Sequence, residues 1–103
     1  MSKIIIQGTH LELTEEIKNY IYEKFNKLDR YFDNILEIRV EVERALPGHH
    51  NKGKVYRAEA NVHVPKKILR VEKTAEDLFK AIDKTEKHMR EIIKEHKGKI
   101  MEK

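Results

Sequence analysis

The sequence of 103 residues predicts a two-layer α+β domain, a four-stranded sheet with both helices on one face, in the order β-α-β-β-β-α. Three observations support this fold class. Apolar residues recur every three or four positions in two segments, they alternate with polar residues in two others, and short turn sequences separate the segments. Hydrophobic residues make up 39% of the chain, which is enough for one core and therefore for one domain.

The first two elements are a strand and a helix. An Ile-rich strand is expected at residues 3–7, followed by a bend at residues 8–10. Thr14 is the expected N-cap of a helix that runs to about residue 31, with Glu15 and Glu16 in the first turn, where the helix dipole favours anions. Apolar residues at steps of four, four, three and four give its buried face: Ile17, Ile21, Phe25, Leu28 and Phe32.

Three strands are predicted to follow as an antiparallel meander. Residues 36–43 alternate apolar and charged side chains, and residues 56–64 repeat the pattern. Residues 46–54 between them are rich in turn formers and form a hairpin loop, whereas residues 65–67 form a tight turn into a strand at residues 68–73. The inward side chains are expected to be Leu36, Ile38, Val40, Val42, Tyr56, Ala58, Ala60, Val62, Val64, Leu69 and Val71.

A long helix completes the domain. Thr74 is its expected N-cap, with Glu76 and Asp77 in the first turn, and Gly98 is its expected end. The buried stripe consists of Leu78, Ile82, Met89 and Ile93, flanked by Phe79 and Ile92. Residues 1–98 therefore form one domain, and residues 99–103 form a tail or the start of a linker.

The sequence offers little for catalysis. It has no cysteine, Ser2 is its only serine, and its four glycines are too scattered for a phosphate-binding loop. We therefore expect no enzyme, no catalytic residue, no cofactor and no small-molecule substrate. Glu41 and Glu43 share the outer side of the sheet, where Arg39 and Arg44 favour a solvated, charge-balanced face over an acid/base pair.

The six histidines do not have the spacing of a metal site. His49 and His50 are adjacent in a loop, and His88 and His96 are eight positions apart on a helix, unlike the i, i+4 pairs of helical zinc sites. We interpret them as solvated surface residues. No apolar segment is long enough to span a bilayer or to act as a signal peptide, so the expectation is a cytoplasmic protein without a membrane partner.

Positive charge is unevenly distributed. The formal net charge is only +4, but residues 47–74 contain seven basic residues and two acidic ones, an excess of five. This excess includes Lys66 and Lys67 in the tight turn and Arg70 in the strand at residues 68–73. Such clustering favours a polyanionic partner more strongly than the net charge does.

Both helices are predicted to carry basic flanks. At about 100° per residue, Lys87, Arg90, Lys94 and Lys97 align on one flank of the last helix, whereas Asp77, Glu91 and Glu95 lie toward the other. On the first helix Tyr20, Lys24, Lys27 and Tyr31 share a flank. Lysines with interleaved tyrosines suit RNA, because ammonium groups contact phosphates and phenol rings contact sugars or bases. The alternative is a solvated face, with the tyrosines completing the core edge and their hydroxyls in water.

Three sequence blocks resemble a known family. Ile6-Gln7-Gly8 leading to Leu13-Thr14-Glu15, then residues 24–33 (KFNKLDRYFD) and residues 77–83 (DLFKAID), are similar to the bacterial ribosome hibernation promoting factor and ribosome-associated inhibitor family, also called the sigma-54 modulation protein family. The resemblance spans nearly the whole chain. At His88 and Glu91 the chain departs from the Lys and Arg usual in the family, and basic residues stand instead at Lys87, Arg90 and Lys94.

The resemblance implies a fold similar to double-stranded RNA-binding domains and a partner, the small ribosomal subunit with its ribosomal RNA. The family binds in the mRNA and tRNA cleft and inhibits translation by steric exclusion, with basic residues of both helices on RNA, here Lys24 and Lys27. The family also has a long form that dimerises ribosomes. Whether this chain is a short form or the amino-terminal part of a long one stays open, as does a role in ribosome dimers. The alternative functions are a protein-interaction module and a generic structured-RNA binder.

Overall fold

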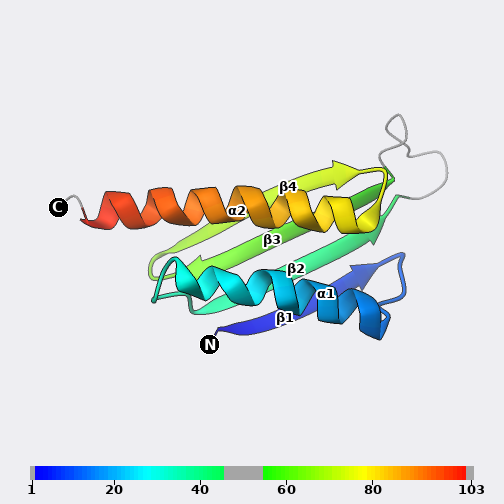
Figure 1. The fold of residues 1–103 in the computed structure, drawn as a ribbon, viewed down its shortest axis with the longest axis horizontal. Coiled ribbons are helices and arrows are strands. Elements are labelled where there is room, and N and C mark those ends of the chain that lie inside the picture. The colour runs from blue at the N-terminus through cyan, green and yellow to red at the C-terminus, as the bar shows by residue number, and fades with distance from the viewer. Residues whose placement is uncertain (1, 46–54, 102–103) are drawn as a thin grey trace.

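The computed structural model describes residues 2–45 and 55–101 (Figure 1). The predicted hairpin loop at residues 46–54 lies outside them. The elements are, in order, β1 (Lys3–Thr9), α1 (Glu15–Phe25), the 3-10 helix η1 (Asn26–Arg30), β2 (Glu37–Arg44), β3 (Tyr56–Val64), β4 (Lys67–Ala75) and α2 (Leu78–Met101).

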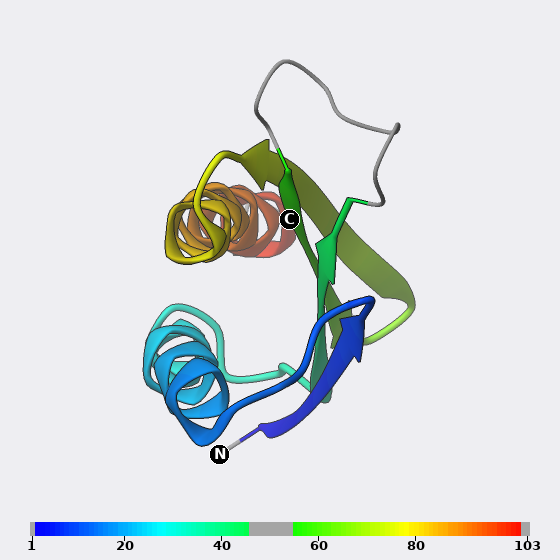
Figure 2. The same ribbon diagram turned by 90° about the vertical axis from the view of Figure 1, so that its right-hand side faces the viewer.

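The fold has two layers, as the sequence predicts. The sheet has the order β1-β2-β3-β4, and Figure 2 shows both helices on the same side of it. β2, β3 and β4 form the predicted antiparallel meander, whereas β1 pairs in parallel with β2. The parallel pairing follows from α1, because a helix returns the chain to the end of the sheet from which β1 began.

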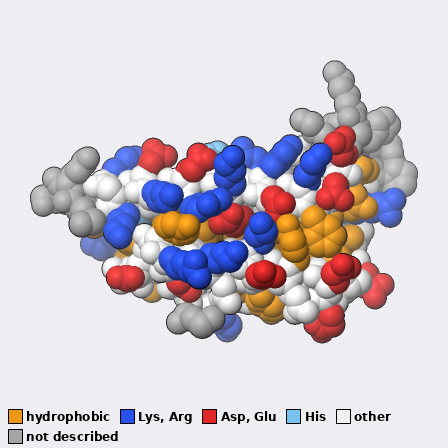
Figure 3. All heavy atoms as spheres, viewed as in Figure 1, with side chains coloured by type: hydrophobic (Ala, Val, Ile, Leu, Met, Phe, Trp, Pro, Cys, Tyr) orange, Lys and Arg blue, Asp and Glu red, His pale blue; other side chains and the backbone are white. Residues whose placement is uncertain are grey.

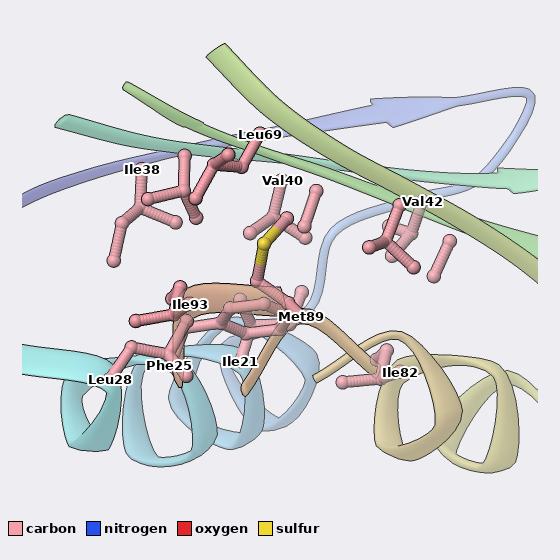
Figure 4. Close-up of a cluster of buried hydrophobic side chains, with 14 of the residues drawn as sticks. Ile21, Phe25, Leu28, Ile38, Val40, Val42, Leu69, Ile82, Met89 and Ile93 are labelled. Carbon is pink, nitrogen blue, oxygen red and sulfur yellow. The ribbon is translucent and has the colours of Figure 1, made fainter. Parts of the chain in front are cut away.

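The core lies between the sheet and the helices. Figure 4 shows Phe25 and Ile21 of α1 directed at Met89 and Ile93 of α2, below Val40 of the sheet. All of these side chains are 0–1% exposed. The alternation predicted for the strands is confirmed at buried positions Ile38, Val40, Val42, Ala58, Ala60, Val62, Val64, Leu69 and Val71. Tyr56 is only half-buried against the core, and the predicted burial of Leu36 is wrong, since it is 62% exposed and precedes β2, while Ile35 is buried instead.

The first helix begins where predicted, but its α-helical part ends at Phe25 rather than near residue 31. Thr14 is its N-cap, because its hydroxyl Oγ1 accepts a hydrogen bond from the Ile17 amide at 3.2 Å. After Phe25 the chain tightens into η1, which ends at Arg30. This tighter turn keeps Leu28 fully buried under the sheet.

Both predicted ends of the last helix are wrong. Thr74 remains in β4, paired with Arg57 of β3, so it does not cap the helix. Asp77 does so instead, since its Oδ2 accepts a hydrogen bond from the Lys80 amide at 3.0 Å. The helix continues through Gly98 to Met101, because a glycine costs a helix only about 1 kcal/mol and does not remove a backbone donor.

The β3–β4 turn and one histidine also differ from expectation. Lys66 follows Pro65 with a φ of 68°, the geometry of a type II turn, and β4 begins directly after it at Lys67. His96 is not a solvated surface residue. Its ring packs edge-on against Phe32, with centroids 5.3 Å apart, and its Nε2 is buried without a hydrogen-bond partner among the described residues.

Candidate nucleic-acid interface

Cations from both helices gather on the face that α1 and α2 share. Figure 3 shows lysine and arginine side chains along both helices, with a hydrophobic strip between them. We call this the interhelical surface and define it by Lys24, Lys27, Tyr31, Arg90, Lys94 and Lys97. Lys94 Nζ lies 4.9 Å from the centroid of the Tyr31 ring, which joins the two predicted basic flanks.

The cations of the interhelical surface differ in their partners. Lys24 Nζ lies 3.4 Å from Asp83 Oδ1, and Arg90 lies 3.4 Å from the carboxylate of Glu86. Lys27, Lys94 and Lys97 are exposed and have no carboxylate within 4 Å in residues 2–45 and 55–101. These three ammonium groups are therefore available to an external anion.

Tyr20 has a different environment from the one predicted. Its hydroxyl donates a hydrogen bond to Asp83 Oδ1 at 2.6 Å, a partner on α2 that the sequence did not indicate. This bond, with burial and the nearby Asp83 charge, raises the pKa of Tyr20 from 10.0 to about 12. The Tyr20 ring packs edge-on against Phe79 at 4.8 Å, so it belongs to the junction of the helices.

Sequence reasoning missed Asp83 as a residue of this site. On a helical projection at about 100° per residue, Asp83 falls on the same flank as Arg90 and Lys94. That position was the signal that a carboxylate interrupts the basic flank of α2. The partner on α1 was not predictable, because the pairing of Tyr20 and Lys24 with Asp83 depends on how the helices pack.

Lys87 lies apart from the interhelical surface. It lines an open groove of about 840 Å³ between α2 and the end of β4. Glu91 also lines the groove, so a residue of the predicted acidic flank of α2 lies close to Lys87 of the predicted basic flank. The full lining is Arg57, Glu72, Lys73, Thr74, Lys84, Lys87, His88 and Glu91.

The hairpin residues of the predicted site are also divided. Lys66 and Lys67 are exposed at the β3–β4 turn, at the end of the sheet toward which the C-terminal part of α2 runs (Figure 1). Arg70 instead lies on the outer face of the sheet, where its Nε is 2.9 Å from Asn61 Oδ1 and 3.2 Å from a Glu59 oxygen. The interhelical surface and Arg70 are thus on opposite sides of the molecule.

The outer face of the sheet is rich in carboxylates, and Arg57 lies at its centre. Its guanidinium is within 2.7–3.5 Å of oxygens of Glu41, Glu43, Glu59 and Glu72. Burial opposes the charge of Arg57, yet these hydrogen bonds raise its pKa above the ordinary value. A hydrogen bond from the Thr9 hydroxyl, supported by Arg57, lowers the pKa of Glu41. Glu41 and Glu43 are therefore paired on a solvated face rather than forming an acid/base pair, as predicted, but their partner is Arg57 rather than Arg39 or Arg44.

The described residues contain no group of three or more side chains placed to hold a metal ion. In the same part of the chain, neither helix is long and apolar enough to cross a membrane.

Comparison with known proteins identifies relatives. The family profile described as sigma 54 modulation protein / S30EA ribosomal protein matches residues 4–101. A ribosome hibernation promotion factor of Deinococcus radiodurans is 31% identical over 96 residues, and one of Lactococcus lactis is 32% identical over 105. These alignments cover 93% and 97% of this chain but 49% and 52% of the relatives, so the chain spans about half their length.

A shorter relative and two solved structures agree with this similarity. The ribosome hibernation promoting factor of Acidithiobacillus ferridurans is 37% identical over 81 residues, which cover 79% of this chain and 99% of the relative. The Protein Y N-terminal domain of Thermus thermophilus superimposes with a TM-score of 0.72 at 33% identity, covering 93% of this chain and 99% of that one. A ribosomal subunit interface protein from Coxiella burnetii shares the fold, with a TM-score of 0.75 at 19% identity and coverage of 93% and 98%. The chain therefore belongs to the sigma 54 modulation protein / S30EA ribosomal protein family, a family of non-enzymatic hibernation and modulation factors, as its sequence blocks predicted.

Proposed function

We propose that this chain is a ribosome hibernation factor that binds the small ribosomal subunit and acts in the cytoplasm, where ribosomes are. The observation that carries the proposal is the family match over residues 4–101, which includes both helices of the interhelical surface. The relatives named as hibernation factors support the same role. No catalytic step is needed, since such a factor acts by occupying a site.

The interhelical surface supplies the chemistry for ribosomal RNA. Its exposed lysines suit phosphate oxygens, and Tyr31 offers a ring beside them. Lys66 and Lys67 extend the cationic surface at the turn, and Lys87 extends it beside β4. Arg70 has no part in our proposed contact, because it faces the opposite way and is paired with Glu59.

We further propose that the domain occupies the cleft that otherwise holds mRNA and tRNA, and that it inhibits translation by steric exclusion. Phosphate contacts would supply affinity and the two-layer shape would supply position. Such binding is expected to weaken steeply as salt rises, because each neutralised phosphate releases counterions.

Co-sedimentation with purified small ribosomal subunits tests the proposal. We expect binding at low salt, release at high salt, and loss of mRNA binding by subunits that carry the protein. A folded protein that does not co-sediment would contradict the proposal. Equal affinity for subunits and for an unrelated RNA duplex would favour the generic RNA binder, and a homodimer in light scattering without subunit binding would favour the protein-interaction module.

A further inference from the structure

A carboxylate lies within the interhelical surface. Asp83 of α2 accepts a hydrogen bond from the Tyr20 hydroxyl at 2.6 Å and pairs with Lys24 Nζ at 3.4 Å. Its side chain is 45% exposed, and that of Lys24 is 35% exposed. Asp83 is thus both attached to α1 and accessible to a molecule that binds across the helices.

The contacts of Asp83 leave one oxygen available. The Tyr20 hydroxyl donates to Oδ1, the nearest approach of Lys24 Nζ is also to Oδ1, and Oδ2 accepts no hydrogen bond from the described residues. An ionised carboxylate only accepts hydrogen bonds. It therefore attracts hydroxyl and amino groups and repels phosphate oxygens, in contrast to the lysines around it.

Tyr20 fixes the direction of this carboxylate. The phenol ring packs edge-on against Phe79 of α2 at 4.8 Å, and Lys24 Nζ lies 5.6 Å from the ring centroid. Because the ring is held by the packing of the helices, its hydroxyl restricts the rotation of the Asp83 side chain. Such an oriented acceptor discriminates between ligands, whereas a mobile one would move away from a phosphate.

We propose that Asp83 is a specificity-determining residue of the interhelical surface, accepting through Oδ2 a hydrogen bond from an RNA donor such as a ribose 2′-hydroxyl or a base amino group. This inference rests on the proposed function. In the matching RNA site a phosphate reaches the lysines while the donor meets Asp83. An RNA that lacks a donor at this position places a phosphate near the Asp83 carboxylate instead. The two negative charges repel each other and Lys24 stays paired with Asp83, so this RNA binds more weakly than the matching site.

The variant Asp83→Asn tests this, because it keeps the shape and an acceptor for Tyr20 but replaces one oxygen with a donating amide. We expect its affinity for an unrelated RNA duplex to rise several-fold, with a salt slope steeper by about 0.7–0.9 for the one lysine released. Its affinity for small ribosomal subunits is expected to fall. The ratio of the two affinities should therefore drop by about an order of magnitude, the range expected for one or two misplaced hydrogen bonds.

Two variants complete the experiment. Glu95→Gln makes the same change in net charge on an exposed part of α2 and is expected to leave the ratio within about two-fold, since it removes only a screened charge. Asp83→Glu retains a carboxylate and is expected to keep most of the discrimination, which also covers the case that Asp83→Asn does not fold. Equal gains for both RNAs in Asp83→Asn, or loss of discrimination in Asp83→Glu, would overturn the inference. If the unmodified protein does not bind subunits, the proposed function fails instead.

Discussion

The Tyr20 hydroxyl of α1 donates a hydrogen bond to the Asp83 carboxylate of α2 at 2.6 Å, which joins the two helices through polar atoms at the surface that both present. This bond raises the pKa of Tyr20 to about 12, because ionisation of the phenol would place two negative charges side by side.

The first prediction is that the Tyr20 phenol ionises at a higher pH than an ordinary tyrosine. A group whose pKa is higher in the folded state favours folding below its unfolded pKa, here 10.0, and loses that contribution as pH rises through the folded value near 12. Absorbance titration should show a tyrosine with a midpoint near 12, and stability should fall between these two pH values. In Tyr20→Phe that late phase should be absent. A late phase that persists in the variant would assign it to another tyrosine.

The second prediction concerns binding through the exposed cations. The triple variant Lys27→Glu, Lys94→Glu and Lys97→Glu should weaken binding to small ribosomal subunits by about 100-fold or more at low salt and reduce the salt slope by about two, since each lost phosphate contact removes 0.7–0.9 from the slope. Its melting temperature should change little, because these side chains are exposed. Arg90 is left intact, since reversing it would place a second carboxylate beside the buried Glu86.

A charge-matched control uses the outer face. Arg70→Glu with Lys3→Glu and Arg39→Glu makes the same change in net charge on the side of the sheet without helices. Small-subunit binding should then weaken by no more than about ten-fold through the long-range field. Equal losses in the two triple variants would contradict the assignment of the binding face.

The third prediction concerns Arg57. Arg57→Met should lower the free energy of unfolding at neutral pH by about 1–3 kcal/mol, because the surrounding glutamates lose their common cation while the guanidinium site is only partly exposed. Arg39→Met removes one exposed pair and should cost less than about 1 kcal/mol. Chemical denaturation measures both.

The pH dependence of the same variant gives a fourth prediction. In the unmodified protein the pKa of Glu41 is lowered, so its contribution to stability is present above the ordinary pKa of 4.5 and is lost as pH falls through the folded value. In Arg57→Met, protonation instead relieves repulsion among the glutamates, so the melting temperature should rise on mild acidification. Parallel curves of melting temperature against pH for the two proteins would show that the contribution of the glutamates to stability does not depend on Arg57.

The fifth prediction concerns Gly8 in β1. A Cβ at this position would lie 2.8 Å from the Leu11 carbonyl oxygen and 2.9 Å from Leu13 Cγ, because the chain folds back against the strand. Since a backbone atom must move, Gly8→Ala should destabilise the protein by about 1–3 kcal/mol. Gly98→Ala is the matched control, as nothing lies within 4 Å of its added carbon, and it should stabilise α2 by up to about 1 kcal/mol. Thermal unfolding of both variants tests the contrast.

The sequence predicted the layers of this fold because each element is one-sided. Alternation in β3 identified every buried position from Ala58 to Val64, and the steps from Ile17 to Phe32 identified the buried face of α1 and η1. The same rules failed at boundaries. Leu36 continues the alternation in the sequence but precedes β2 and is exposed. Thr74 has the side chain of a helix cap, but its pairing with β3 keeps it in the sheet.

The candidate site was predictable only in part, for a related reason. Helical spacing assigned Lys24, Tyr31 and Lys94 to flanks, and the structure brings those flanks together. Spacing within one helix does not state which residues of two helices meet, so the contact of Asp83 with Tyr20 was missed. Arg70 was grouped with residues on the opposite side of the sheet, although the alternation that places Leu69 and Val71 inward already places Arg70 on the outer face.

The distribution of charge across the sheet has a kinetic consequence. The outer face carries five glutamates, Glu37, Glu41, Glu43, Glu59 and Glu72, against four basic residues, Lys3, Arg39, Arg57 and Arg70, while exposed lysines gather over the helices. Among the described residues, positive charge is therefore displaced from the sheet toward the helices, and the field of a polyanion favours an approach with the helices facing it. Electrostatic orientation of this kind acts on the association rate constant more than on the lifetime of a complex. In the proposed complex with RNA, carboxylates on the far side of the sheet would thus increase the fraction of encounters that begin in the productive orientation.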